Sequence, residues 1–206
     1  MGNYKDGDSN TDGHPYSVSL GHALEITLEV APHHLNDLVI IGGDWSGHPS
    51  RYSYLEHRGF LDSVEWVPSQ VFVAGVESLR SLPLVATLLR LGRARNLYIV
   101  SNASVNGACG SNLIEVSRTN SWASQALVQK HVSHLPNSSV VLYCCGLPAS
   151  VFCYDGWVAR PDLTHINMGH FFDRAYGVNS RSWHNDNDAR CRVYDRYFAP
   201  LITGAA

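Results

Sequence analysis

The sequence predicts an α/β fold: a single Rossmann-like domain with a mainly parallel sheet and helices on both faces. Short apolar runs alternate along the chain with segments of helical period, the order typical of parallel sheets. The run at residues 140–145 is apolar throughout and starts with two valines, as in a strand covered on both faces. The chain has 206 residues, 45% of them hydrophobic, which suits one domain with a substantial core. Because we find no linker and no internal repeat, residues 16–206 are expected to form that domain, after a polar, glycine-rich tail at residues 1–15.

Six apolar runs have the length of buried strands and lie between turn-forming residues. In the last but one, Cys144 and Cys145 are adjacent, so their side chains should point to opposite faces of the sheet and fill the core. The expected strands are residues 38–41, 70–74, 97–100, 113–116, 140–145 and 164–168.

Segments of helical period separate these strands. Residues 19–31 are ambiguous, since they show both the alternation of a strand and an apolar stripe of a helix. Pro83 is tolerable only in the first turns of its helix, and Pro200 should end the last one. Residues 101–112, rich in Ser, Asn and Gly, are long enough to form a flap over a site. The other expected helices are residues 52–62, 77–91, from 120 or 121 to 134, from 148 to about 155, and 185–199.

The stretch from residue 138 to residue 173 is expected to organise the molecule as one βαβ unit. Gly146 frees the backbone for a sharp turn, and Pro148 suits the first position of the following helix. The free N–H groups and the dipole of that helix favour an anion, commonly phosphate, beside residues 146–149. Any α/β protein also needs such a turn, so a purely structural role stays open. His170 ends the second strand and could bond a ligand phosphate or hydroxyl, or be a satisfied loop histidine.

Bulk composition excludes several classes of function. The net charge of −3 leaves no basic field for a phosphate backbone, so nucleic acid is not an expected partner. We expect no membrane span, because no apolar run reaches the roughly 18 residues that a span needs. The N-terminus has no apolar signal core, and five cysteines without paired spacing fit reduced thiols. These features predict a cytoplasmic protein.

Four short motifs follow one another along the chain. They are Gly43-Asp44-Trp45-Ser46 after a strand, Asn120-Ser121-Trp122-Ala123, the turn and helix from Gly146 through Pro148 and Ala149 to Asp155, and Asn167-Met168-Gly169-His170 followed by Asp173 and Arg181. In this order they resemble the motifs of the GT-D glycosyltransferases, a small Rossmann-like family first known as a domain of unknown function. The resemblance covers about residues 20–181, favours a helix at residues 19–31 and implies that residues 16–206 are a GT-D-like domain.

The resemblance implies transfer of a sugar from a nucleotide-sugar donor, most often a UDP-sugar, to a sugar or glycoconjugate acceptor. It implies that Asp44 holds Mn²⁺ or Mg²⁺ and takes part in catalysis. The implied substrate-binding residues are Gly43, Ser46, Asn120, Trp122, Gly146, Pro148, Ala149, Gly169, His170 and Arg181.

The first motif departs from the family pattern of two acids. Ser46 stands where the family has its glutamate, and Trp45 replaces a small residue. A magnesium ion can still bind one carboxylate and the donor phosphates, because it commonly keeps several waters, but its affinity should fall. The chain is therefore expected to transfer sugar with weak metal dependence, or to be a non-catalytic nucleotide-sugar-binding or scaffold protein on the same fold.

Asp173 is the expected catalytic base, since it follows the end of a strand where donor and acceptor would meet. Arg181 lies eight residues further on and could fold back to pair with Asp173 or to grip a phosphate. The alternative is that both residues form an ion pair that fastens the C-terminal segment.

Overall fold

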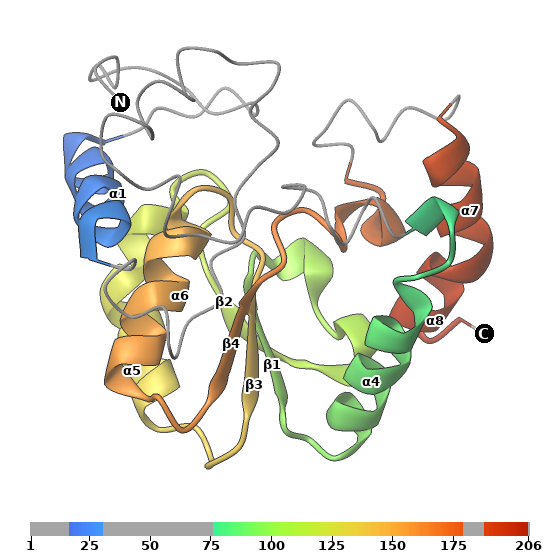
Figure 1. Ribbon diagram of the computed structural model, residues 1–206, viewed down its shortest axis with the longest axis horizontal. Coiled ribbons are helices and arrows are strands. Elements are labelled where there is room, and N and C mark those ends of the chain that lie inside the picture. The colour runs from blue at the N-terminus through green and yellow to red at the C-terminus, as the bar shows by residue number, and fades with distance from the viewer. Residues whose placement is uncertain (1–16, 31–75, 179–187, 206) are drawn as a thin grey trace.

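The computed structural model describes residues 17–30, 76–178 and 188–205. Within them, four parallel strands form one sheet in the order β2-β1-β3-β4 (Figure 1). The strands are β1 (Leu97–Ser101), β2 (Asn112–Glu115), β3 (Val140–Tyr143) and β4 (Thr164–Asn167). Their positions confirm the strands expected in this part of the chain, and the parallel sheet confirms the predicted α/β class. The strands expected at 38–41 and 70–74, and the helix expected at 52–62, lie outside the described residues.

Helices cover both faces of the sheet, as predicted (Figure 1). One face carries α4 (Leu82–Arg93), α7 (Ala189–Tyr197) and α8 (Ala199–Thr203). The other carries α5 (Gln125–Ser133) and α6 (Pro148–Ala159), with α1 (Val18–Val30) packed outside α6. The helix expected at residues 19–31 is thereby confirmed. Cys144 lies in the core under the first group of helices, while Cys145 packs against the core under the second, so the prediction of opposite faces holds.

Several helix boundaries differ from those expected. The helix expected from residue 120 or 121 starts as a 3₁₀ turn, η4 (Ser121–Ser124), and α5 follows it at Gln125. The helix expected from residue 77 begins at Leu82, and Pro83 then occupies its first turn. The helix cannot start earlier, because Leu79, in the turn before it, has a positive φ of 59°, which a right-handed helix does not allow. The helix α6 runs to Ala159 rather than stopping near residue 155. Pro200 does not end the last helix but starts α8, where its missing N–H costs nothing.

The segment between β1 and β2 is not the flap that its composition suggested. It forms two short 3₁₀ turns, η2 (Ala103–Val105) and η3 (Ala108–Gly110). Val105, Ala108 and Cys109 are all buried in the core beneath α4. Burial of these apolar side chains outweighs the mobility expected of a Ser- and Gly-rich loop.

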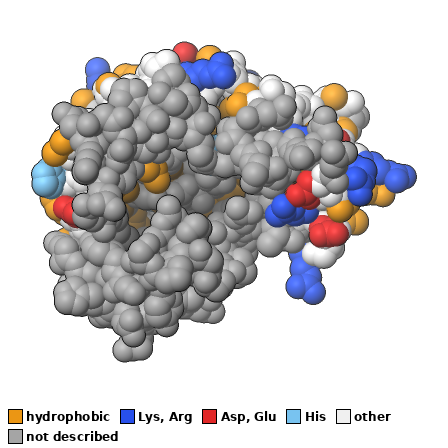
Figure 2. All heavy atoms as spheres, turned by 90° about the horizontal axis from the view of Figure 1, so that it is seen from above, with side chains coloured by type: hydrophobic (Ala, Val, Ile, Leu, Met, Phe, Trp, Pro, Cys, Tyr) orange, Lys and Arg blue, Asp and Glu red, His pale blue; other side chains and the backbone are white. Residues whose placement is uncertain are grey.

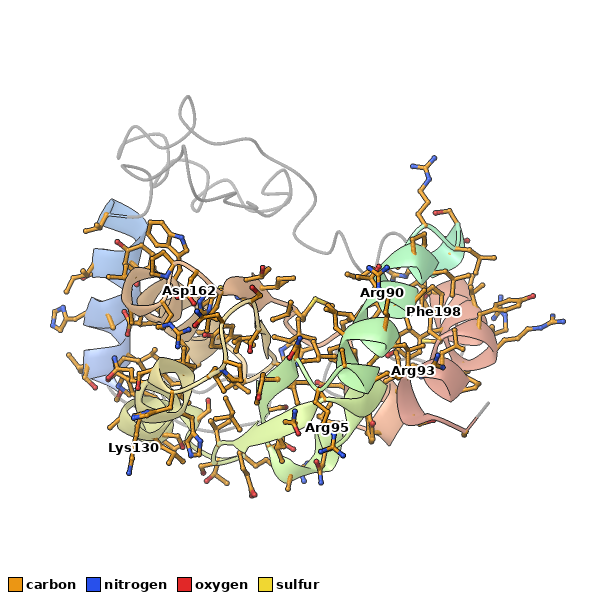
Figure 3. All side chains as sticks on the ribbon, turned by 90° about the horizontal axis from the view of Figure 1, so that it is seen from below. Arg90, Arg93, Arg95, Lys130, Asp162 and Phe198 are labelled. Atoms are coloured by element: carbon orange, nitrogen blue, oxygen red, sulfur yellow. The ribbon has the colours of Figure 1, made fainter. Side chains whose placement is uncertain are left out.

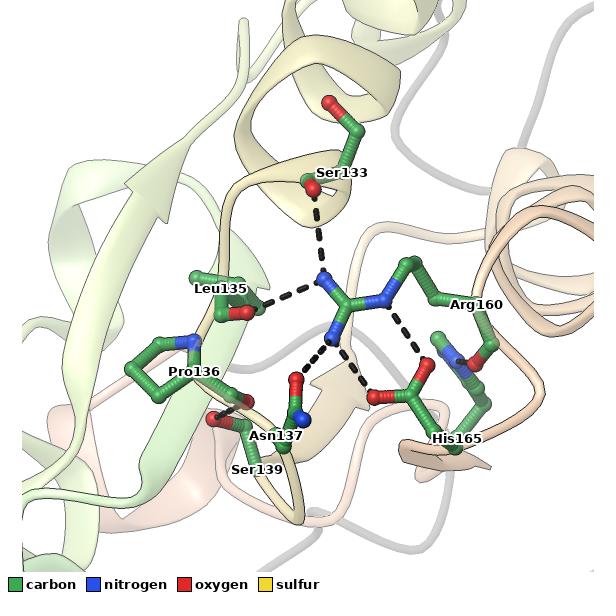
Figure 4. Close-up of polar contacts among 8 residues, drawn as sticks. Ser133, Leu135, Pro136, Asn137, Ser139, Arg160 and His165 are labelled. Carbon is green, nitrogen blue, oxygen red and sulfur yellow. Dashed lines mark hydrogen bonds and ion pairs between the residues drawn. The ribbon is translucent and has the colours of Figure 1, made fainter.

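A single arginine ties together the segments that precede β3 and β4 (Figure 4). The Arg160 guanidinium bonds both carboxylate oxygens of Asp162, at 2.8 and 2.6 Å. It also donates to the carbonyls of Ser133 and Leu135 and to the side chain of Asn137. The pair raises the pKa of Arg160 and lowers that of Asp162. The guanidinium therefore joins the end of α5 to the loop that precedes β4.

Charged side chains of both signs lie together at the end of the molecule formed by α4 and α7 (Figure 2). Arg174 pairs with Asp195, and Arg190 pairs with Asp188, whose pKa that hydrogen bond lowers to about 2. Seen from below, Arg90 and Arg93 lie at the opposite side of the sheet from Lys130 (Figure 3). Basic side chains of the described segments are thus spread over both ends of the molecule. No helix in residues 17–30, 76–178 or 188–205 is long and apolar enough to cross a membrane.

Candidate functional site

The carboxyl ends of the four strands share one edge of the sheet, because all the strands are parallel. From β1 the chain moves to β2 on one side, and from β3 it moves to β4 on the other. The order of strands therefore reverses between β1 and β3. In open α/β sheets the crevice at such a reversal is where ligands bind.

The turn after β3 presents backbone N–H groups at this reversal. Gly146 has a φ of +76°, and a β-carbon there would meet nothing within 4 Å, so conformation rather than space requires glycine. The N–H groups of Ala149 and Ser150 bond back to the carbonyls of Gly146 and Leu147, at 3.1 and 3.2 Å. The N–H groups of Gly146 and Leu147 have no acceptor among the described residues. Together with the dipole of the 12-residue helix α6, they suit an anion at this turn.

Hydroxyl groups fix the backbone that follows β3 at this edge. Ser101 at the end of β1 donates to the carbonyl of Cys144, at 2.9 Å, and Ser121 donates to the carbonyl of Cys145, also at 2.9 Å. Burial raises the pKa of both thiols. The two cysteines therefore stay neutral near pH 7, which argues against a thiolate nucleophile here.

The end of β4 is tied to the start of α6 by Asn167. Its side-chain oxygen accepts a hydrogen bond from the Gly169 N–H at 3.0 Å, and its amide nitrogen donates to the Ser150 hydroxyl at 3.1 Å. Gly169 itself has a positive φ of 55°. The turns that follow β3 and β4 are thus linked to each other by side-chain hydrogen bonds.

A histidine and a carboxylate form a pair on the turn after β4. The Nδ1 atom of His170 lies 2.7 Å from the Oδ2 atom of Asp173. The Asp173 side chain is only 9% exposed, whereas that of His170 is 21% exposed. A carboxylate accepts, so Nδ1 donates in this contact, and the tautomer that fits it when the ring is neutral has its lone pair on Nε2. Such a pair can orient an imidazole as a proton acceptor.

Six of the predicted site residues meet at this edge: Gly146, Pro148, Ala149, Gly169, His170 and Asp173. Two others have structural contacts. Asn120 accepts a hydrogen bond from the Ala123 N–H, and the Trp122 indole donates to Ser19 on α1 at 2.9 Å and stacks on Phe152 of α6. Gly43, Asp44, Ser46 and Arg181 lie outside the described residues.

Sequence reasoning missed a groove at the carboxyl ends of β1 and β2. Its volume is about 480 Å³, within the range of small-ligand sites. Glu115, the last residue of β2, contributes a carboxylate to the groove. The only sequence signal for the groove was this charged residue inside an expected strand. The groove is lined by Asn102, Ala103, Ser104, Glu115, Val116, Ser117, Arg118, Ser124 and Leu127.

The metal expected at Asp44 is not tested by these residues. Within the three described segments, no group of three or more His, Cys, Asp or Glu side chains could hold a metal ion. The features that bear on function are the turn at residues 146–149, named the anion-binding turn for the ligand that it suits, the His170–Asp173 pair and the groove. No protein-family model matches the chain, and no similar protein is found among the curated proteins or the solved structures.

Proposed function

We propose that this chain is a glycosyltransferase that uses a nucleotide-sugar donor, with a UDP-sugar as the first candidate. The observation that carries the proposal is that the anion-binding turn and the histidine–carboxylate pair follow adjacent strands, β3 and β4. Neighbouring strands lie about 4.8 Å apart, so a phosphate at Gly146 and a sugar beside His170 can belong to one ligand.

In this proposal the donor phosphates lie against residues 146–149, where the N–H groups and the dipole of α6 stabilise them. Nε2 of His170 accepts the proton of the acceptor hydroxyl while that oxygen bonds to the anomeric carbon of the donor sugar. The bond from that carbon to the phosphate oxygen breaks, and the nucleotide leaves with the electron pair. Asp173 would then stabilise the imidazolium and act as a positioning residue, so that this proposal gives His170 the role of base that the sequence predicted for Asp173.

A divalent ion at Asp44, bound with the donor, would supply further positive charge to the phosphates. The steps above depend on described residues only. A second candidate function, a non-catalytic nucleotide-sugar-binding or scaffold protein, shares the turn but has no use for an oriented histidine.

The test uses UDP-, GDP-, CMP- and dTDP-sugars, each with and without manganese. Thermal shift measures whether the protein binds each donor, and a second assay measures donor hydrolysis or sugar transfer. A ligand at a hundred times its Kd adds about 2.7 kcal/mol of stability, which thermal shift detects. His170→Gln should then lower kcat by about 10²- to 10⁴-fold with little change in donor affinity. Asp173→Asn should lower kcat and change its pH profile, since it removes the carboxylate that accepts from the His170 ring.

His131→Gln, an exposed histidine on α5, is the matched control and should keep full activity. Donor binding without any turnover would favour the non-catalytic module. Equal turnover in His170→Gln and the unmodified protein would show that the base is elsewhere.

A further inference from the structure

We infer that the groove at the carboxyl ends of β1 and β2 binds the nucleoside, ribose and base, of the donor; this inference rests on the proposed function. The groove lies on the opposite side of the anion-binding turn from His170, since β1 separates β2 from β3 in the sheet. A donor with its phosphates at Gly146 and its sugar toward β4 must extend its nucleoside the other way, toward β1 and β2.

The distance agrees with this direction. From β3 across β1 to β2 is two strand spacings, about 10 Å. A nucleoside joined to a diphosphate at Gly146 extends over a comparable length. The acceptor sugar is not expected in the groove. In the proposed function it lies next to His170, after β4, at the other side of β3 from β1 and β2.

The polar groups of the groove match a ribonucleoside. Glu115 is exposed at the end of β2, where a carboxylate can accept hydrogen bonds from the ribose hydroxyls, as in other parallel α/β sheets. The side-chain oxygen of Asn102 accepts from the Ser104 N–H at 3.0 Å, which holds the amide in place and leaves its NH₂ to donate to a base carbonyl. Leu127, 45% exposed, provides apolar surface for the base.

The test measures binding to the full chain by titration calorimetry, with nucleoside diphosphates, the 2′-deoxy form of the tightest one, and inorganic pyrophosphate. The ribonucleotide should bind about 10- to 100-fold more tightly than its deoxy analogue, the range of a hydrogen bond to a charged group. Glu115→Gln should remove most of this difference and leave the deoxy form unaffected. Ala103→Trp, at an exposed position of the lining, should fill the groove and weaken both nucleotides.

Neither variant should change the affinity for pyrophosphate, which needs only the turn after β3. Glu25→Gln, on α1 outside the groove, is the matched control and should bind as the parent does. The inference is overturned if both groove variants keep the parent's nucleotide affinity, or if pyrophosphate affinity falls in parallel. It is also overturned if the parent binds no nucleoside diphosphate, or if Ala103→Trp loses transfer but keeps nucleotide affinity, since an acceptor would then occupy the groove.

Transfer assays on the same samples separate the two proposals. Nucleotide affinity that responds to Glu115→Gln, without turnover for any donor, would sustain the nucleoside site and contradict the glycosyltransferase. The opposite result is that His170→Gln loses turnover while both groove variants keep their nucleotide affinity. That result would support the glycosyltransferase and contradict the nucleoside site.

Discussion

A contact with a single atom can decide whether a substitution stabilises or destabilises the protein, and Gly156 in α6 is the clearest case. An alanine β-carbon there would meet the Tyr143 hydroxyl and lie 2.9 Å from Nδ1 of His165. These two groups are themselves hydrogen-bonded at 2.9 Å, and Nε2 of His165 lies 3.1 Å from the carbonyl oxygen of Arg160. Glycine to alanine within a helix normally gains about 1 kcal/mol, but overpacking costs about 1–3 kcal/mol. We expect Gly156→Ala to lower the free energy of unfolding by up to about 2 kcal/mol, measured by urea denaturation.

The control is the double variant with Tyr143→Phe, which removes the hydroxyl that the new methyl group meets. It should be less destabilised than the sum of the two single variants, because the sites share one contact. Additive effects would mean that α6 moves away from the sheet as a unit. Val158→Ala, at an exposed position of the same helix, should be nearly neutral.

At the scale of elements, α4 and the crossover between β1 and β2 approach backbone to backbone at Gly92. A β-carbon there would collide with the Cys109 carbonyl oxygen, and the Gly110 carbonyl carbon would be 3.1 Å away. Backbone atoms cannot rotate aside as the Tyr143 hydroxyl can. We therefore expect Gly92→Ala to destabilise the protein by about 3 kcal/mol, more than Gly156→Ala.

Thermal unfolding should show this as a fall in Tm of roughly 10 °C, from about 2–4 °C per kcal/mol for a chain of this size. Ala86→Gly, an exposed position on the same helix, tests the opposite change and should cost only about 1 kcal/mol. If Gly92→Ala is no worse than Ala86→Gly, the crossover is not packed as tightly as described.

At the scale of the whole molecule, one aromatic cluster joins the C-terminal helices to the turn that carries the candidate site. Phe171, next to His170, is fully buried and makes edge-on contacts with Phe172, Tyr194 and Phe198. The Tyr194 hydroxyl also donates to the Phe171 carbonyl. Removing this ring leaves a cavity between α7, α8 and the sheet.

We expect Phe171→Ala to cost about 3–5 kcal/mol of stability, as buried phenylalanines do. It should also lower any turnover measured well below the Tm, because the neighbouring His170 loses its support. Tyr197→Ala, on the exposed side of α7, should change neither. A Phe171→Ala protein with normal stability would place the C-terminal helices outside the cooperative core.

The sequence by itself determined what depends on local pattern. Apolar runs predicted the four described strands, and their alternation with helices predicted the parallel sheet. The signal was clearest at β3, where all four residues are buried and apolar, as a strand covered on both faces requires. Gly146 and Pro148 predicted a turn and a helix start, since each has a backbone preference independent of its neighbours.

Only the tertiary structure decided what depends on contacts between distant residues. Gly156 reads as a helix stop, yet it marks a close approach to Tyr143. The segment 101–112 has the composition of an exposed loop, yet the side chains of Val105 and Cys109 anchor it in the core under α4. Asp173 has the position of a base, yet its carboxylate is buried against His170. Such outcomes follow from which surfaces meet when the sheet and helices assemble, and the sequence of one segment carries little information about its distant partners.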